Sequence, residues 1–248
     1  MSLVKNVRAF KNWYLFYAGR FGFLHKEFEI RHRSGIRVKV RPGTDDLMIV
    51  KSNWVTKHYM RDFVPIRRDS IVIDVGAHIG SFSILAATMA RRVLAFEPEP
   101  SNYQMLKKNR DLNRLENLSL FEMAVSGSDG HQALSVYEAS STGNHSLYAM
   151  GSKRVVERDV ETISLREIMK REGLSQVDFL KLDCEGAEHD ILRKMIPETA
   201  AKIMCVAMET HRVPTDSSID IPSRLQELGF EVRVEQNGGY VYAKQAAR

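Results

Sequence analysis

Residues 71–80 read IVIDVGAHIG, and this stretch decides the fold class. The run 71–75 is short and rich in β-branched apolar residues, which is typical of a strand buried on both faces. The segment Gly76–Gly80 that follows has small residues and two glycines, which permit a sharp turn and a close backbone approach. Apolar residues then recur at helical spacing from Phe82 to Met89. The order strand, glycine turn, helix predicts an α/β protein.

The same order repeats toward the C-terminus. Further buried strands are predicted at residues 92–96, 118–125, 177–183 and 202–209, and helices at 101–113, from about 187, and at 217–229. Strands that alternate with helices predict a doubly wound, mostly parallel sheet with helices on both faces. Residues 230–236 and 238–244 predict a closing antiparallel hairpin.

We divide the chain into an N-terminal arm, residues 1–68, and a main domain, residues 69–248. A helix is predicted over residues 3–18 and a hairpin over 28–40, because apolar and charged residues alternate on both sides of the turn pair Ser34-Gly35. Residues 41–68 are less regular.

The positive charge of the chain is concentrated in the arm. The whole chain carries a net charge of +5, whereas residues 1–41 hold ten Lys or Arg and two Glu, which is a net charge of +8. Three alternatives stay open for this segment. Its basic and aromatic side chains could bind an anionic membrane surface, could hold nucleic acid, or could pack on the body or on a second subunit. These side chains are Lys5, Arg8, Phe10, Lys11, Trp13, Tyr14, Phe16 and Tyr17.

Composition and length exclude several classes of protein. The chain has 248 residues, of which 44% are hydrophobic and 27% charged, so it is neither disordered nor fibrous. No stretch reaches the ~18–20 apolar residues of a membrane span. Two cysteines without a CxxC pair predict a reducing compartment and no structural zinc. We therefore expect a cytoplasmic protein, with peripheral membrane contact through residues 1–20 as one alternative.

An adenosine-containing cofactor is predicted at the first glycine turn. Glu97 ends the second strand, 23 residues after Asp74, where a carboxylate accepts hydrogen bonds from ribose hydroxyls. The spacing D-x-G-x-x-x-G places His78 where the dinucleotide fingerprint has its middle glycine. The acid before the first glycine repels a pyrophosphate but suits an ammonium and a sulfonium. These features favour S-adenosylmethionine (SAM) over NAD.

The chain resembles the FkbM family of SAM-dependent methyltransferases. The resemblance rests on four blocks: residues 74–80, residues 95–98, Asn109 and Asn113 with residues 124–126, and residues 179–188 (FLKLDCEGAE). It covers about residues 45–245. It implies a seven-stranded Rossmann-like methyltransferase sheet and O-methylation of sugar, polyketide or glycolipid hydroxyls.

The resemblance also implies which residues contact the cofactor. Asp74, Gly76, His78 and Gly80 are expected around its methionine part, Glu97 at the ribose, and Ala124 near the adenine. His78 stands where members of the family commonly carry Asn; both side chains donate hydrogen bonds. The full set of predicted cofactor contacts is Asp74, Gly76, Ala77, His78, Gly80, Ser81, Glu97, Pro98, Ala124, Val125 and Asp183.

Catalytic residues are expected where the fourth and fifth strands end. Ligands bind at the carboxyl ends of strands in open α/β sheets, and Asp183, Glu209 and His211 fall there. Two alternatives stay open: the three bind a divalent cation that activates the acceptor hydroxyl, or His211 or Asp183 is a metal-free general base. Glu185 and Glu188 either join this site or cap the following helix.

Residues 127–161 interrupt the regular pattern. The polar loop 140–146, with His145, is predicted either to cover the acceptor site as a lid or to be a solvated surface loop.

We therefore predict a methyltransferase that acts on a hydroxyl of a small molecule or glycan. Two alternatives are an RNA or protein methyltransferase that uses the basic arm, and a SAM-binding protein without catalysis. Nucleic acid is not the expected partner. The sequence leaves the identity of the acceptor, the oligomeric state and metal dependence open.

Overall fold

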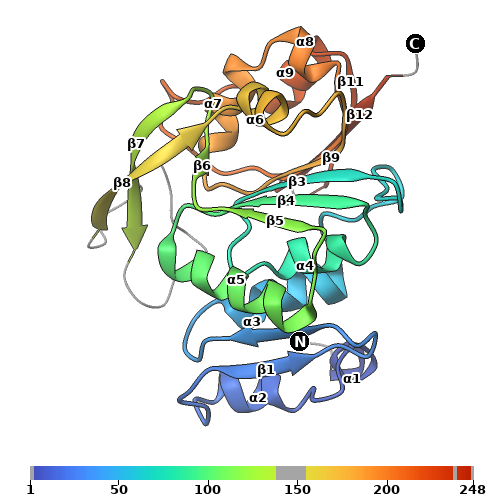
Figure 1. Cartoon of the computed structure of the whole chain (residues 1–248), viewed down its shortest axis with the longest axis vertical. Coiled ribbons are helices and arrows are strands. Elements are labelled where there is room, and N and C mark those ends of the chain that lie inside the picture. The colour runs from blue at the N-terminus through green and yellow to red at the C-terminus, as the bar shows by residue number, and fades with distance from the viewer. Residues whose placement is uncertain (1–2, 138–154, 237–238, 247–248) are drawn as a thin grey trace.

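The computed structural model describes residues 3–137, 155–236 and 239–246 (Figure 1). Its helices are α1 (Leu3–Ala9), α2 (Leu15–Arg20), α3 (Asp46–Lys51), the π-helix η1 (Ser52–Thr56), α4 (Ser81–Ala87), α5 (Pro100–Asn113), α6 (Leu165–Arg171), α7 (Ala187–Lys194), α8 (Pro197–Ala200) and α9 (Ile221–Glu227). Its strands are β1 (Phe28–Arg31), β2 (Arg37–Val40), β3 (Ile71–Val75), β4 (Arg92–Phe96), β5 (Leu118–Phe121), β6 (Ala124–Val125), β7 (Gly130–Tyr137), β8 (Val155–Ile163), β9 (Val177–Leu182), β10 (Ile203–Glu209), β11 (Phe230–Val234) and β12 (Tyr240–Gln245).

A seven-stranded sheet in the order β11-β12-β10-β9-β3-β4-β5 forms the centre of the molecule. The five strands from β10 to β5 are parallel, and the hairpin β11–β12 joins β10 in antiparallel orientation. The prediction of a doubly wound, Rossmann-like methyltransferase sheet with a C-terminal antiparallel hairpin is thus confirmed.

The central strands are buried on both faces, as their apolar runs predict. In β3, Ile73 and Val75 face one hydrophobic core, which they share with α6, α7 and α9. Val72 faces the other core, which it shares with α4, α5 and the arm. Figure 1 shows these two helical layers above and below the sheet. Because every parallel strand has the same direction, their carboxyl ends meet at one edge, where a ligand site can form.

The arm is folded onto the body. Phe10 and Trp54 are buried in the same hydrophobic core as Val72 and Ala95 of the central sheet. Asn109 and Asn113 of α5 hydrogen-bond to both the N–H and the C=O groups of Lys39 and Arg37 in β2. These amides cover the edge of β2 as a neighbouring strand would. The boundary between residues 68 and 69 stays a prediction.

The prediction of one helix over residues 3–18 is wrong, because the chain leaves the helix between α1 and α2. Phe10 forms a β-bridge to His32, and the Lys11 N–H donates to the Arg31 carbonyl at 2.8 Å. The Asn12 side chain donates to the Glu29 carbonyl and accepts from the Arg31 N–H. Such side-chain bonds to a strand edge compete with helical hydrogen bonds. The predicted hairpin is confirmed as β1–β2.

The predicted strand over residues 118–125 is two strands. β5 stays in the central sheet, whereas β6 pairs with β8 in a separate three-stranded sheet, β6-β8-β7. The insertion 127–161 therefore supplies a projecting hairpin beside the edge of the large sheet (Figure 1). The loop 140–146 and His145 lie outside the described residues.

Within the described ranges, none of the helices is long and apolar enough to cross a bilayer.

Candidate active site

A pocket opens at the carboxyl edge of the sheet, between β3, β4, β6 and β9. Nine of the eleven residues predicted to contact a cofactor line it: Gly76, Ala77, His78, Ser81, Glu97, Pro98, Ala124, Val125 and Asp183. They come from four separate segments of the chain, residues 76–81, 97–98, 124–125 and Asp183, which the fold brings together.

The turn after β3 forms the floor of this pocket. Gly76 has φ +73°, and a Cβ added to it would lie 1.8 Å from the Asp183 carbonyl oxygen, so only glycine fits. The N–H groups of Gly76 and Ala77 both donate to the Phe96 carbonyl at 3.0 Å. The turn is thereby held against the ends of both neighbouring strands.

Glu97 presents a buried carboxylate to the pocket. It is 5% exposed and accepts hydrogen bonds from the N–H groups of His78 (2.7 Å) and Glu99 (3.0 Å). Burial raises its pKa to about 7, because a charged carboxylate is poorly solvated there. His78 itself has φ +53°, a left-handed conformation that a non-glycine residue seldom adopts.

The two remaining predicted residues lie behind the turn. Asp74 is fully buried; its Oδ1 lies 2.9 Å from Lys181 Nζ and its other oxygen accepts from the Ser83 hydroxyl. Gly80 packs on α5, since a Cβ there would lie 2.4 Å from Leu106 Cδ1. Asp74 thus pairs with a lysine of β9, and Gly80 brings α4 and α5 together.

Lys181 joins the turn to the end of β9. Its ammonium group is buried, donates to the Gly76 carbonyl at 2.8 Å and lies 3.5 Å from Asp183 Oδ2. Although burial opposes it, the negative charges of Asp74 and Asp183 raise the pKa of Lys181 above its usual range. The pKa of Asp183 is lowered, since Lys181 and His211 outweigh the effect of burial. Asp74, Lys181 and Asp183 therefore form an ion-paired triad, of which Lys181 and Asp183 line the pocket.

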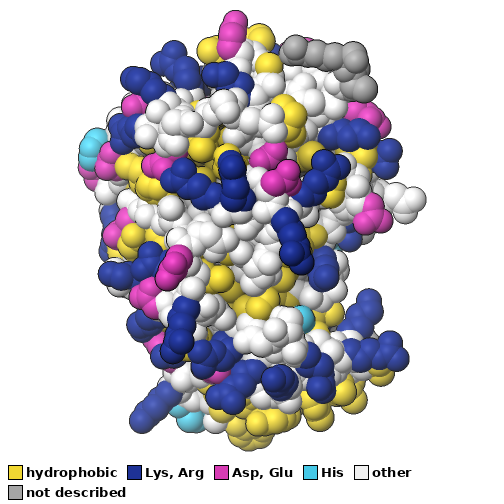
Figure 2. All heavy atoms as spheres, turned by 45° about the vertical axis from the view of Figure 1, so that its right-hand side comes forward, with side chains coloured by type: hydrophobic (Ala, Val, Ile, Leu, Met, Phe, Trp, Pro, Cys, Tyr) yellow, Lys and Arg dark blue, Asp and Glu magenta, His cyan; other side chains and the backbone are white. Residues whose placement is uncertain are grey.

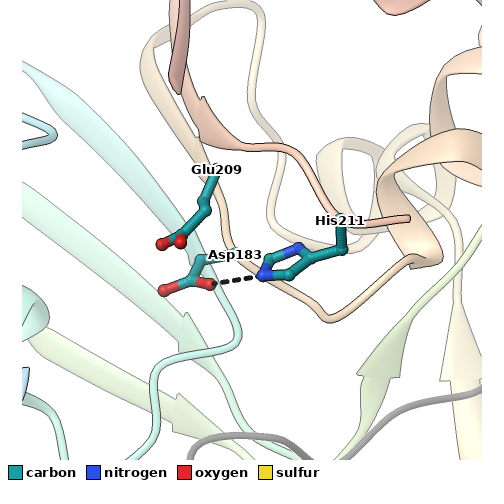
Figure 3. A group of neighbouring side chains, drawn as sticks. All are labelled: Asp183, Glu209 and His211. Atoms are coloured by element: carbon teal, nitrogen blue, oxygen red, sulfur yellow. Dashed lines mark ion pairs between the residues drawn. The ribbon is translucent and has the colours of Figure 1, made fainter. Parts of the chain in front are cut away.

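Asp183, Glu209 and His211 meet beside the pocket, as predicted. One ligand atom from each lies within 4.8 Å of the others, and Figure 3 shows their side chains converging from the ends of β9 and β10. The Glu209 carboxylate accepts from the hydroxyls of Tyr59 (3.1 Å) and Tyr240 (3.0 Å).

His211 is surrounded by carboxylates. Its Nδ1 lies 2.9 Å from Glu188 Oε1, and its Nε2 lies 3.7 Å from Glu185 and 3.9 Å from Asp183. Burial lowers its pKa, but the hydrogen bond and charge of Glu188 and the charges of Glu185 and Asp183 raise it to about 10. His211 is therefore an imidazolium at neutral pH.

These charges fit a divalent cation poorly. The ammonium of Lys181 lies 3.5 Å from Asp183, and its positive charge opposes a second cation at this carboxylate. The metal alternative thus receives no support from the donor set.

Glu188 ties together the segments that follow β9 and β10. It is fully buried and accepts from the N–H groups of Gly186 (2.9 Å) and His211 (2.7 Å) as well as from the His211 ring. Glu188 therefore holds His211 in place and does not only cap α7. Glu185 has φ +53° and lines the pocket, and burial raises its pKa to about 7.

The arm supplies pocket residues that the sequence did not suggest. Ile49 and Asn53 line the pocket. The Asn53 amide donates to the Ser81 hydroxyl at 2.6 Å, and Trp54 Nε1 donates to the Ser81 carbonyl at 2.7 Å. These residues belong to α3 and η1, within residues 41–68, where the sequence shows no regular alternation of apolar and polar residues.

We expect the stability of the protein to report the protonation of His211. Its folded pKa of about 10 exceeds the usual 6.5, so its contribution is complete below pH 6.5 and is lost as pH rises toward 10. The free energy of unfolding should fall by up to about 1.4 kcal/mol per pH unit in this window. Urea unfolding at several pH values would measure the slope, and His211→Gln should flatten it. An equal slope in both proteins would contradict the assignment.

Comparison with known proteins places this site in a family. Residues 74–232 match the family described as the methyltransferase FkbM domain. Methyltransferase 1 of Beauveria bassiana is 30% identical, over 76% of this chain and 82% of the relative. The 31-O-demethyl-FK506 methyltransferase FkbM of Streptomyces tacrolimicus is 25% identical, over 72% and 79%. Hexuronic acid methyltransferase AglP of Haloferax volcanii is 28% identical, over 51% and 50%. The match covers the turn after β3, Glu97, Asp183 and His211, and this chain belongs to the FkbM family of methyltransferases.

Proposed function

We propose that the protein is a SAM-dependent methyltransferase whose acceptor is a hydroxyl group of a small molecule or glycan. The observation that carries this proposal is the pocket in which Glu97 faces the Gly76 turn and Asp183. Two relatives support the acceptor class: one is named for 31-O-demethyl-FK506 and the other for a hexuronic acid.

The residues of the pocket fit SAM. Glu97 would accept hydrogen bonds from the ribose hydroxyls. The backbone of Gly76 and Ala77 leaves room for the methionine part, and Asp183 supplies negative charge beside it. Ala124, Val125 and Leu134 offer an apolar wall for the adenine. Bound SAM supplies an electrophilic methyl group.

Within the protein, Glu185 is our candidate for the group that takes the proton from the acceptor hydroxyl. A general base works best when its pKa lies near the working pH. Glu185 has a pKa of about 7 and lines the same pocket as Asp183, whereas His211 already holds a proton. We therefore give Asp183 a place beside the reacting atoms, and Glu209 and His211 positioning roles.

We expect Glu185→Gln to lower kcat by about 10²–10⁴-fold while SAM affinity stays unchanged, because general base catalysis is worth this much. In the wild type, kcat should rise with pH up to about 7, as Glu185 loses its proton. The variant should lose this rise. Glu231→Gln, on the exposed hairpin, is the matched control. A variant with wild-type rate and pH profile would refute the role.

The proposed function itself is tested by incubating the protein with methyl-labelled SAM and a panel of hydroxylated acceptors. The panel should contain uronic acids, neutral sugars and macrolides, with RNA and protein as competitors. Label on an oxygen of a sugar or macrolide supports the proposal. Label in RNA or protein instead, or SAM binding without any transfer, would favour the two alternatives.

A further inference from the structure

The arm carries an unusual set of exposed apolar side chains. Phe21 and Phe23 are 67% and 73% exposed, and their ring centroids lie 6.4 Å apart on either side of Gly22. Tyr14 on the turn before α2 is 56% exposed, and Leu3 and Val4 on α1 are also exposed. We call Tyr14, Phe21 and Phe23 the apolar face of the arm, because Tyr14 and Phe21 flank α2 seven positions apart and so lie on the same side of this helix. Figure 2 shows hydrophobic side chains gathered at this lower end of the molecule.

The position of Phe21 and Phe23 follows from local structure. Gly22 has φ +74° and turns the chain at the end of α2. The Gly22 N–H donates to the Gly19 carbonyl and the Phe23 N–H to the Ala18 carbonyl, so the turn is fixed. Phe10 and Phe16 are buried, as the alternative that the aromatics pack on the body predicts. The exposed pair therefore lies on an ordered turn.

Basic side chains surround the apolar face. Lys5, Arg8, Lys11 and Lys26 are exposed, and across the described part of the chain no carboxylate lies within 4.0 Å of them. Residues 1–41 together carry a net charge of +8. In Figure 2, Lys and Arg side chains border the hydrophobic patch. Apolar side chains within a ring of bases match a bilayer surface with anionic headgroups.

We propose that the apolar face of the arm docks this protein onto an anionic lipid bilayer. Its aromatic rings would enter the interface while Lys5, Arg8 and Lys11 contact the headgroups. Charge argues against a second copy as the occupant, because a two-fold interface here would place two copies of residues 1–41, each with a net charge of +8, opposite each other. Nucleic acid would use the bases and rings but leave Leu3 and Val4 in water. Docking on a bilayer through this face requires no particular methyl acceptor.

Flotation of the full chain with lipid vesicles tests this docking. Wild-type protein should float with phosphatidylcholine–phosphatidylglycerol vesicles, less with pure phosphatidylcholine, and less at high salt. Phe21→Ser with Phe23→Ser should lower the partition coefficient at least ~10-fold, since two apolar rings no longer enter the interface. Val156→Ser with Ile196→Ser, two exposed apolar residues outside the arm, is the matched control and should bind like the wild type.

A second pair of variants tests the charges. Lys5→Glu, Arg8→Glu and Lys11→Glu together should lower the partition coefficient on the order of 100-fold, since each base near an anionic surface contributes. Lys107→Glu, Lys170→Glu and Lys202→Glu change the net charge equally on exposed sites of the body and should have a much smaller effect. All variants should keep the circular dichroism spectrum of the wild type.

Three results would overturn the proposal. One is wild-type protein that stays unbound with anionic vesicles. Another is vesicle binding that Phe21→Ser with Phe23→Ser leaves unchanged. The third is a sedimentation experiment in which the wild type is a dimer and the Phe21→Ser, Phe23→Ser variant is a monomer. The apolar face would then be an interface between two copies of the chain.

Discussion

Glu97→Gln should weaken the binding of SAM and of S-adenosylhomocysteine by about 10²–10³-fold. In the proposed complex the Glu97 carboxylate accepts two hydrogen bonds from the ribose. Hydrogen bonds to a charged group contribute about 1.5–3 kcal/mol each, and the neutral amide accepts them more weakly. The amide also has a single acceptor oxygen for the N–H groups of His78 and Glu99, which now bond to separate oxygens. Calorimetric titration of both proteins would measure the ratio.

The same carboxylate predicts how affinity depends on pH. The free protein has a Glu97 pKa of about 7, and the ribose hydroxyls favour the ionised form. Affinity should therefore rise between pH 5.5 and about pH 7 and then level off, and Glu97→Gln should remove this dependence. Glu231→Gln is the control that should bind like the wild type. Equal affinities for wild type and Glu97→Gln would show that the cofactor does not contact Glu97.

Lys181→Met should lower the free energy of unfolding by about 3–5 kcal/mol. It removes the cation of a buried pair and leaves the negative charge of Asp74 without its partner, which is the costly way to break such a pair. The hydrogen bond from Lys181 to the Gly76 carbonyl is lost as well, so the turn after β3 should loosen. Urea unfolding at pH 7 would measure the loss.

Two further variants decide whether the ion pair is the cause. Lys202→Met removes an exposed lysine and should change stability by less than about 0.5 kcal/mol. Asp74→Asn combined with Lys181→Met removes both charges and should recover part of the loss, because no unpaired charge remains. A double variant as unstable as the sum of the two single variants would contradict an interaction between Asp74 and Lys181.

The strands of the sheet could be predicted because their burial is complete. In the runs 71–75 and 92–96 every residue except Asp74 and Arg92 is apolar, which is typical of a strand covered on both faces. The turn at Gly76 could be predicted for a related reason, since the close approach of Asp183 demands glycine. Here local sequence and tertiary structure demand the same residues.

The sequence was less informative where distant segments meet. Asp74 was expected at the cofactor, but its partner Lys181 lies more than a hundred residues away and draws its carboxylate behind the turn. The break in the predicted helix 3–18 likewise depends on the bond between Asn12 and Glu29. Such pairings have no local signature, so hydrophobic period alone cannot find them.

The same limit applies to the catalytic end of the site. The predicted strands place Asp183, Glu209 and His211 at neighbouring strand ends, and the structure brings the three side chains together there. The positive charge of His211 depends on Glu188 and Glu185, whose carboxylates lie 2.9 Å and 3.7 Å from its ring nitrogens. The turn before α7 brings them to this position. Helix capping was the simpler expectation for Glu188, and its contact with His211 appears only in three dimensions.

A crystal structure of the protein with S-adenosylhomocysteine would show whether the cofactor binds between the Gly76 turn, Glu97 and Asp183, as we propose. We expect electron density for the ligand in this pocket, with its ribose hydroxyls within hydrogen-bonding distance of Glu97. Ligand density at another place, or an empty pocket at a concentration that saturates binding in solution, would contradict it.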